Sequence, residues 1–323
     1  MFLKNQYYEK AMMKNMSNKL TRNEIKIIGL SSVGGALEFF EFTIYALFSE
    51  YIGAHFFPSK NTSATLLMTF GVYALGYLAR PIGGMVFGHL GDKYGRKNTF
   101  SLTILLMSAS TLLIGCLPSY ETIGISATVL LIFLRILQGF SVGGEISGAT
   151  VFTAEHLPIN YRGLGIGILF MGITLGNTLG GLVGFTLNYS LGEKAMMAWG
   201  WRLPFLLGFF LGIFSYIIRR NTLETPVFQE IERKKKLHRI PLITLFKTSW
   251  KSVMTGIAVM AISSTMIGFF LYLPTYLFVF FNFKMQNAFL LNTISFLILS
   301  VLTAVFGCIS LYPCRQRHIN SDS

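Results

Sequence analysis

Glycines and charges crowd into one short stretch of this chain, Gly88-His89-Leu90-Gly91-Asp92-Lys93-Tyr94-Gly95-Arg96-Lys97. Two long apolar runs, Thr65–Phe87 and Phe100–Leu117, border it on either side. A membrane helix needs about 20 predominantly apolar residues, so both runs are close to the length that a span requires. The pattern predicts a tight loop that joins two membrane helices.

The composition of the whole chain agrees with a membrane protein. Of its 323 residues, 52% are hydrophobic and only 13% are charged, whereas a soluble domain carries about 25% charged residues. Most of the apolar blocks lack the polar face that a helix of a soluble bundle shows. We therefore expect an all-α fold, a polytopic membrane helical bundle. Eight blocks are candidate spans: Ile27–Tyr51, Thr65–Gly88, Phe100–Leu117, Ile123–Phe152, Gly163–Leu187, Trp201–Ile218, Val253–Phe280 and Ala288–Tyr312.

The net charge of +13 is typical of a nucleic-acid-binding protein, but the placement of the charges argues against that function. Most of the 27 Lys and Arg residues fall in segments that share one side of the membrane if the N-terminus is cytoplasmic. Such asymmetry follows the positive-inside rule. We expect both termini in the cytoplasm, the lipid bilayer and a small-molecule substrate as partners, and no nucleic acid. The sequence does not indicate an oligomeric state.

The distribution of polar segments divides the chain into five parts. A long charged segment separates the first six spans from the last two. The expected parts are a basic N-terminal tail (1–26), a six-helix bundle (27–218), a cytoplasmic linker (219–251), the first two helices of a second bundle (252–312) and a cytoplasmic tail (313–323).

Ionisable side chains inside the spans are the candidate functional residues, because a charge in hydrocarbon is costly and is usually retained for function. Glu38 and Glu41 lie three residues apart on one face of the first span, and Arg135 lies in the fourth. Burial favours the neutral carboxyl group, whereas a nearby guanidinium favours the charged one. A carboxylate held between these influences can bind and release a proton. We expect Arg135 to pair with the two glutamates or to bind a substrate carboxylate; the alternative is a purely structural ion pair.

Other side chains share these faces. Tyr45 follows the glutamates on the stripe of the first span, while Gln138 and Glu145 follow Arg135 on roughly one face of the fourth. Arg80 lies in the inner half of the second span, and for it and Glu145 structural, gating and coupling roles remain open. The predicted residues for substrate binding and proton coupling are Glu38, Glu41, Tyr45, Arg135 and Gln138.

Glycines recur every four residues in the fifth span, at Gly172, Gly176, Gly180 and Gly184. Residues at this spacing lie on one face of a helix, and small side chains allow a second helix to approach closely in lipid. The pattern predicts a packing face rather than a substrate contact.

The motifs resemble the metabolite:proton symporter branch of the major facilitator superfamily, and within it the proline/betaine transporters. Five local patterns carry the resemblance: Gly35-Ala36-Leu37-Glu38-Phe39-Phe40-Glu41-Phe42; Leu78-Ala79-Arg80-Pro81-Ile82-Gly83-Gly84 with the loop at Gly88–Lys97; Arg135-Ile136-Leu137-Gln138-Gly139 with Gly143-Gly144-Glu145; Trp199-Gly200-Trp201-Arg202-Leu203-Pro204-Phe205; and Leu223-Glu224-Thr225-Pro226-Val227-Phe228.

The resemblance implies proton-coupled uptake of a small zwitterion or carboxylate, such as proline or betaine, by alternating access across a bacterial inner membrane. It implies no cofactor, with H⁺ as the coupling ion. By resemblance, Asp92 anchors an inner gate between two helical bundles, with Arg96 and Lys97 on its lipid or linker side. The alternative for this stretch is a plain tight turn. The predicted gating residues are Arg80, Gly88, Asp92, Lys93, Gly95, Arg96, Lys97 and Glu145.

Three features depart from the family pattern. Glu41 stands where an aspartate is usual, and Asn177 replaces the proline of the antiporter pattern, which favours symport. The chain has eight expected spans, whereas the family uses two six-helix halves, so a C-terminally truncated chain is expected. Three hypotheses stay open: a symporter, a transport-inactive relic, and a membrane assembly partner. An enzyme is not indicated, because the sequence carries no metal-ligand cluster, nucleotide-binding loop or nucleophile motif.

Overall fold

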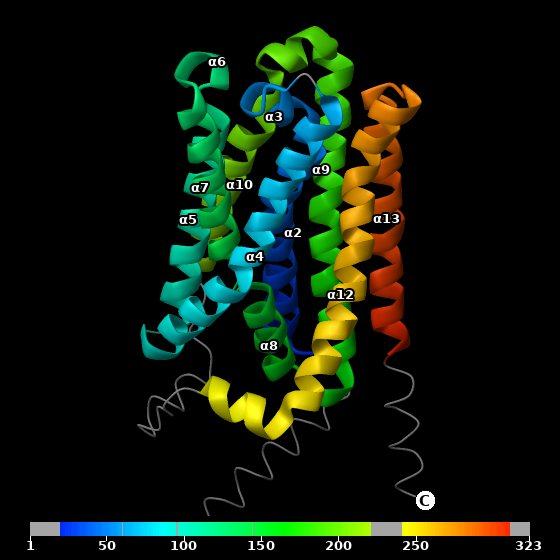
Figure 1. The fold of residues 1–323 in the computed structure, drawn as a ribbon. Coiled ribbons are helices and arrows are strands. Elements are labelled where there is room, and N and C mark those ends of the chain that lie inside the picture. The colour runs from blue at the N-terminus through cyan, green and yellow to red at the C-terminus, as the bar shows by residue number, and fades with distance from the viewer. Residues whose placement is uncertain (1–19, 60, 95, 144, 221–240, 311–323) are drawn as a thin grey trace, which may run out of the picture.

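The computed structural model describes residues 20–59, 61–94, 96–143, 145–220 and 241–310, and every structural statement below concerns this part of the chain. The described residues form a bundle of helices, which confirms the all-α fold (Figure 1). Its long helices are α2 (Arg22–Leu47), α4 (Thr62–Tyr94), α5 (Arg96–Cys116), α7 (Ile125–Val142), α9 (Arg162–Ala198), α10 (Leu203–Arg220), α12 (Pro241–Phe281) and α13 (Met285–Ile309).

Short helical segments connect the long ones. They are α3 (Ser49–Phe56), α6 (Tyr120–Ile123), α8 (Glu145–His156) and two 3-10 turns, η1 (Ile159–Tyr161) and η2 (Gly200–Arg202). A capping box begins α2, in which Thr21 and Glu24 each accept a hydrogen bond from the other's backbone N–H. Within α9, Gly192 has a φ of 72°, so the helix is kinked at a residue that tolerates this conformation.

Seven helices of the described chain are long and apolar enough to cross a membrane. The remaining expected span, Phe100–Leu117 in α5, has a shorter apolar stretch, Ser101–Cys116. Most of the basic N-terminal tail, residues 221–240 of the expected linker and the tail 313–323 lie outside the described residues. The expected division into five parts therefore stays a prediction.

The stretch Gly88–Lys97 joins two long helices, as expected, but most of it is not a loop. Helix α4 continues to Tyr94 and α5 begins at Arg96, so most of this stretch is helical. An α-helix satisfies its backbone hydrogen bonds internally whether its side chains are polar or apolar, and an internal glycine costs only about 1 kcal/mol. The helix can therefore extend beyond the apolar segment that the hydropathy pattern marks.

The fourth apolar block is also not one helix. Helix α7 ends at Val142 and α8 begins at Glu145, with adjacent glycines at Gly143 and Gly144 between them. Two neighbouring glycines weaken a helix because they lose more conformational freedom on folding than any other residue. Glu145 thus belongs to a different helix from Arg135, and the expectation that both lie on one helical face is wrong.

Helix α2 lies in the middle of the bundle. It packs along α9 and α10 and also contacts α4, α5, α8 and α12. Helix α7 packs against α4 and α5, and α5 packs against α10. On the other side of α2, α13 packs along α9, and α12 packs against α13 (Figure 1). Polar residues of α2 are therefore surrounded by other helices.

The glycine ridge of α9 is a packing face, as predicted. A Cβ added at Gly172 would collide with the backbone of Ser32, and one at Gly176 with the backbone of Ala36, both in α2. Further along, added Cβ atoms would lie 3.2 Å from Thr43 for Gly180 and 3.0 Å from Phe289 for Gly184. The ridge thus lets α9 approach α2 and then α13.

A second glycine contact joins α4 and α7. A Cβ at Gly139 would overlap the backbone of Gly76, and one at Gly83 would overlap the carbonyl group of Phe140. Across the same crossing, a Cβ at Gly143 would overlap the carbonyl group of Arg80. The backbones of α4 and α7 therefore touch near both Arg80 and Arg135.

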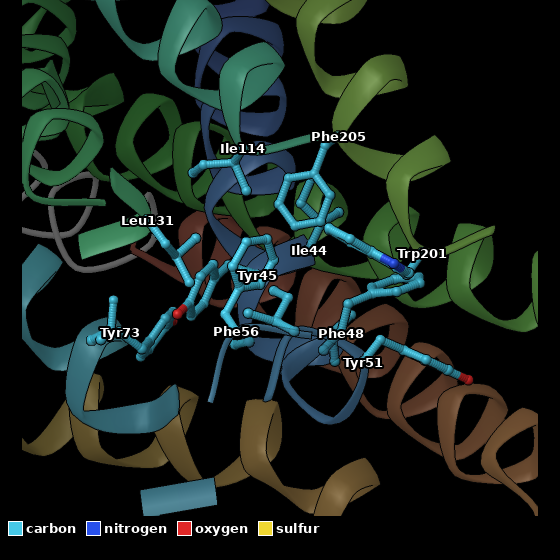
Figure 2. Close-up of a cluster of buried hydrophobic side chains, with 14 of the residues drawn as sticks. Ile44, Tyr45, Phe48, Tyr51, Phe56, Tyr73, Ile114, Leu131, Trp201 and Phe205 are labelled. Atoms are coloured by element: carbon cyan, nitrogen blue, oxygen red, sulfur yellow. The ribbon is translucent and has the colours of Figure 1, made fainter. Parts of the chain in front are cut away.

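Aromatic and aliphatic side chains fill the bundle next to this crossing. Figure 2 shows Tyr45 and Tyr73 side by side, and their stacked ring centroids are 6.1 Å apart. Trp201 is fully buried and packs edge-to-face on Phe56, at a centroid distance of 5.8 Å. These contacts pack α2 against α4, and α3 against η2 just before α10.

Candidate functional site

Glu41 of α2 lies in a polar niche formed by α5 and α10. Its side chain is fully buried, and its Oε2 accepts a hydrogen bond of 2.6 Å from the Thr111 hydroxyl group. Its Oε1 accepts a longer bond, 3.3 Å, from Ser108. Glycines of α10 leave room for the carboxylate, because a Cβ at Gly212 would collide with it. Buried carboxylates are stable in apolar surroundings only with such partners.

A chain of side chains continues from Glu41 to Arg135. Gln138 Nε2 donates a hydrogen bond of 2.8 Å to the Thr111 hydroxyl oxygen, and Arg135 Nη1 donates to Gln138 Oε1. Within the described part of the chain, the hydrogen-bonded path from Arg135 to Glu41 therefore runs through Gln138 and Thr111. This relay of two neutral side chains links Arg135 to Glu41, while the pairing of Arg135 with Glu38 stays a prediction.

Thr111 is the branch point of this chain. Its hydroxyl group also lies 3.0 Å from the carbonyl oxygen of Met107 in the preceding turn of α5. A hydroxyl group has one hydrogen and two lone pairs, so it can accept from Gln138 while donating to one oxygen at a time. Its hydrogen can therefore go to Glu41 or to Met107, both of which lie within hydrogen-bond distance.

Aromatic rings surround the guanidinium group of Arg135. Its Cζ lies 4.1 Å from the ring centroid of Tyr45, 4.2 Å from that of Phe42 and 4.9 Å from that of Tyr73. The side chain of Arg135 is fully buried. Stacking of a guanidinium group on aromatic faces is attractive, so these rings hold the cation in place without neutralising its charge.

The remaining residues predicted for coupling or gating are only partly placed. Glu38 is buried, with 2% of its surface exposed, one turn from Glu41 on α2. Gly88 is exposed, and a Cβ added there would meet none of the described atoms within 4 Å. Asp92 and Lys93 belong to the last turn of α4, Arg96 and Lys97 begin α5, and Glu145 begins α8; their side chains and Gly95 lie outside the described residues. The inner gate therefore stays a prediction.

Asn177, which departs from the antiporter pattern, faces α2. The Thr43 hydroxyl group donates a hydrogen bond to Asn177 Oδ1, and both side chains are fully buried. An internal proline would lack the backbone N–H of the helix. At this position the asparagine preserves the helix and links α9 to α2.

A family model for the Major Facilitator Superfamily matches residues 31–314 of this chain. The chain belongs to the major facilitator superfamily. This membership and the apolar helices make it a multi-pass membrane protein. The fold agrees: the structure of the E. coli xylose transporter XylE in a partially occluded inward-open conformation superposes with a TM-score of 0.69. That match covers 88% of this chain and 70% of XylE, at 18% sequence identity.

Superfamily members with similar sequences are named for the transport of proline and betaine. A protein of Staphylococcus haemolyticus so named is 42% identical over 255 residues, which is 78% of this chain and 54% of that protein. The proline/betaine transporter of Escherichia coli is 38% identical over 262 residues, covering 78% of this chain and 52% of its own length. The same figures hold for the glycine betaine/proline/ectoine/pipecolic acid transporter OusA of Dickeya dadantii. This superfamily member thus spans about half the length of the curated relatives it matches.

Sequence reasoning missed the α5 side of the site. Ser108 and Thr111 are hydroxyl residues in an apolar segment, and such residues commonly bond to their own helix backbone. Their spacing of three residues places them on one helical face, which is the one available signal. That this face meets Glu41 depends on how α5 is rotated against α2.

Thr111→Val is expected to lower the thermal stability of the protein in detergent. Valine has nearly the same shape but cannot donate to Glu41 or accept from Gln138. Buried polar groups that lose a partner cost about 1–3 kcal/mol each. The measurement is the melting temperature, with Ser110→Ala as the control, because the Ser110 hydroxyl bonds to Leu106 within its own helix. Equal melting temperatures for the two variants would contradict the relay.

Proposed function

We propose that this protein carries out proton-coupled uptake of a small zwitterionic metabolite such as proline or betaine, by alternating access. The observation that carries the proposal is the buried chain Glu41–Thr111–Gln138–Arg135, which joins a carboxylate to a guanidinium group across three helices of a membrane bundle. The names of the similar transporters support the substrate class.

The chemistry of this chain favours the joint binding of a proton and a carboxylate. While Glu41 is ionised, its charge balances that of Arg135 through the relay. Protonation of Glu41 removes this balance, and Arg135 then attracts the carboxylate of a substrate more strongly. By linkage, bound substrate raises the affinity of Glu41 for its proton by the same factor. Couplings of this kind are typically worth about 1–3 kcal/mol.

The test is uptake of radiolabelled betaine or proline into vesicles that contain the purified chain. Accumulation is expected when the outside is more acidic than the inside, and a protonophore should remove it. Uptake that is equal with and without the pH gradient would contradict proton coupling. If the correctly inserted chain takes up neither solute, the result contradicts transport by this chain alone and favours an inactive chain or an assembly partner.

We also propose that both ends of the chain face the cytoplasm of a bacterial cell, so that α6 lies outside and η1 inside. The cation distribution supports this orientation. In a background without Cys116, Cys308 and Cys314, a membrane-impermeant thiol reagent should label Thr122→Cys in intact cells. It should label Ile159→Cys, which is 54% exposed as isoleucine, only after the cells are opened. The reverse pattern would overturn the orientation.

A further inference from the structure

Two arginines from different helices share one aromatic ring. The Cζ of Arg80 in α4 lies 4.1 Å from the ring centroid of Phe42, and the Cζ of Arg135 in α7 lies 4.2 Å from the same centroid. The two cationic carbons are therefore separated by no more than about twice that distance. Like charges repel at this range when little water screens them.

The glycine crossing of α4 and α7 is what brings the arginines together. A Cβ on Gly76 would lie 3.3 Å from the carbonyl oxygen of Arg135, and one on Gly143 would overlap that of Arg80. The backbones that carry both arginines are thus in direct contact. Because this crossing is rigid, the two side chains cannot avoid each other by a small movement of one helix.

Both guanidinium groups keep buried donors without a partner among the described residues. In Arg135, Nε and Nη2 make no hydrogen bond, and the residue is fully buried. In Arg80, which is partly buried, the Nε and Nη2 atoms are likewise buried and unpartnered. Buried charged donors of this kind are strongly destabilising unless an acceptor satisfies them. Contacts with aromatic faces offset only part of this cost.

We propose that Arg80 and Arg135 together bind the carboxylate group of the substrate, beside Phe42. This rests on the proposed function and deepens it, because it names the chemical group that is recognised and adds Arg80, for which the sequence left structural, gating and coupling roles open. Guanidinium groups match a carboxylate in shape and bind it through paired N–H donors. The ligands are therefore small carboxylates, and zwitterions bind through their anionic end.

Besides binding the substrate, Arg135 takes part in the hydrogen-bonded chain to Glu41. Its Nη1 is engaged with Gln138, on the side that leads to Glu41, while Nε and Nη2 remain available to the substrate. The guanidinium group of Arg135 thus contacts both the substrate and the hydrogen-bonded chain that leads to Glu41. Arg80 is in contact with Phe42 and with Tyr77, at 4.2 Å from its ring centroid, and acts on the substrate alone.

The test is displacement of radiolabelled glycine betaine from the purified full chain in detergent. Unlabelled betaine and proline should compete. Choline and prolinamide, which keep the cationic end but lack the carboxylate, should not compete even at about 100-fold higher concentration. Displacement by choline that equals displacement by betaine would overturn the carboxylate site and leave the transport proposal standing.

Substitution of each arginine tests whether Arg80 and Arg135 are the residues that bind the carboxylate. Arg80→Lys and Arg135→Lys keep the charge but lose the paired donors, and each should weaken betaine binding about tenfold or more. The matched control is Arg202→Lys, because Arg202 also stacks on a ring, 4.4 Å from Trp201, but outside this site. If neither Arg80→Lys nor Arg135→Lys changes the affinity for betaine, the proposal is wrong. If a variant does not fold, the competition of betaine and choline for the unmodified protein still tests the carboxylate site.

Two further results separate this proposal from the proposed function. Stronger displacement by succinate than by betaine would support the arginine site and contradict a proline or betaine substrate. Binding of none of these carboxylates, measured with protein of normal thermal stability, would overturn both.

Discussion

Glu41→Gln is expected to abolish accumulation of substrate driven by a pH gradient. Glutamine has the size of the protonated glutamate and can still accept the hydrogen bond from Thr111, so the niche between α5 and α10 should remain intact. It can neither bind nor release a proton. The ratio of substrate inside and outside the vesicles should therefore fall to about one, because coupling requires two protonation states.

Exchange of substrate should survive this change. The variant imitates protonated Glu41, in which Arg135 is free to attract a carboxylate, so exchange of labelled for unlabelled betaine across the vesicle membrane should continue. The control is Glu121→Gln, since Glu121 is exposed in α6. If Glu41→Gln still accumulates substrate as the unmodified protein does, Glu41 does not couple transport to protons.

Gly139→Ala is expected to have the largest effect on stability. The added Cβ would overlap the backbone of Gly76, and backbone cannot move aside as a flexible side chain can. Overpacking of this kind typically costs about 1–3 kcal/mol or more, so the melting temperature and the yield of folded protein in detergent should fall. Separation of α4 from α7 should also move Arg80 away from Arg135 and weaken betaine binding.

Gly71→Ala is the matched control for this variant. Gly71 lies in the same helix as Gly76, and a Cβ added there meets nothing within 4 Å. Alanine favours a helix over glycine by up to about 1 kcal/mol, so this variant should be as stable as the original or slightly more so. If both variants melt at the same temperature, the close crossing of α4 and α7 is wrong.

Much of the fold could be predicted from the sequence. The apolar blocks located the long helices, and the motifs at Glu38–Glu41 and Arg135–Gln138 placed the buried polar residues within them. The glycine repeat of α9 correctly identified a packing face. By contrast, the break between α7 and α8 and the helical course of Gly88–Tyr94 were missed, because hydropathy reports where apolar residues are and not where a helix ends.

The candidate site was predicted only in part. Arg135 was expected to pair with Glu38 and Glu41 or to bind a substrate carboxylate, and its hydrogen bonds reach Glu41 through Gln138 and Thr111. Gln138 was named from its motif, whereas Thr111 and Ser108 carry no motif. Arg80 and Arg135 lie 55 positions apart in sequence, and that they share Phe42 follows from a glycine crossing that joins two distant segments.

The sequence alone determined that the chain forms membrane helices and which of them carry charges. The reason is local: hydrocarbon requires a backbone that satisfies its own hydrogen bonds, and each apolar segment meets this requirement as a helix by itself. Only the tertiary structure decided which charged and polar side chains meet. Their meeting depends on the rotation and crossing of helices, which side-chain packing between segments far apart in sequence sets.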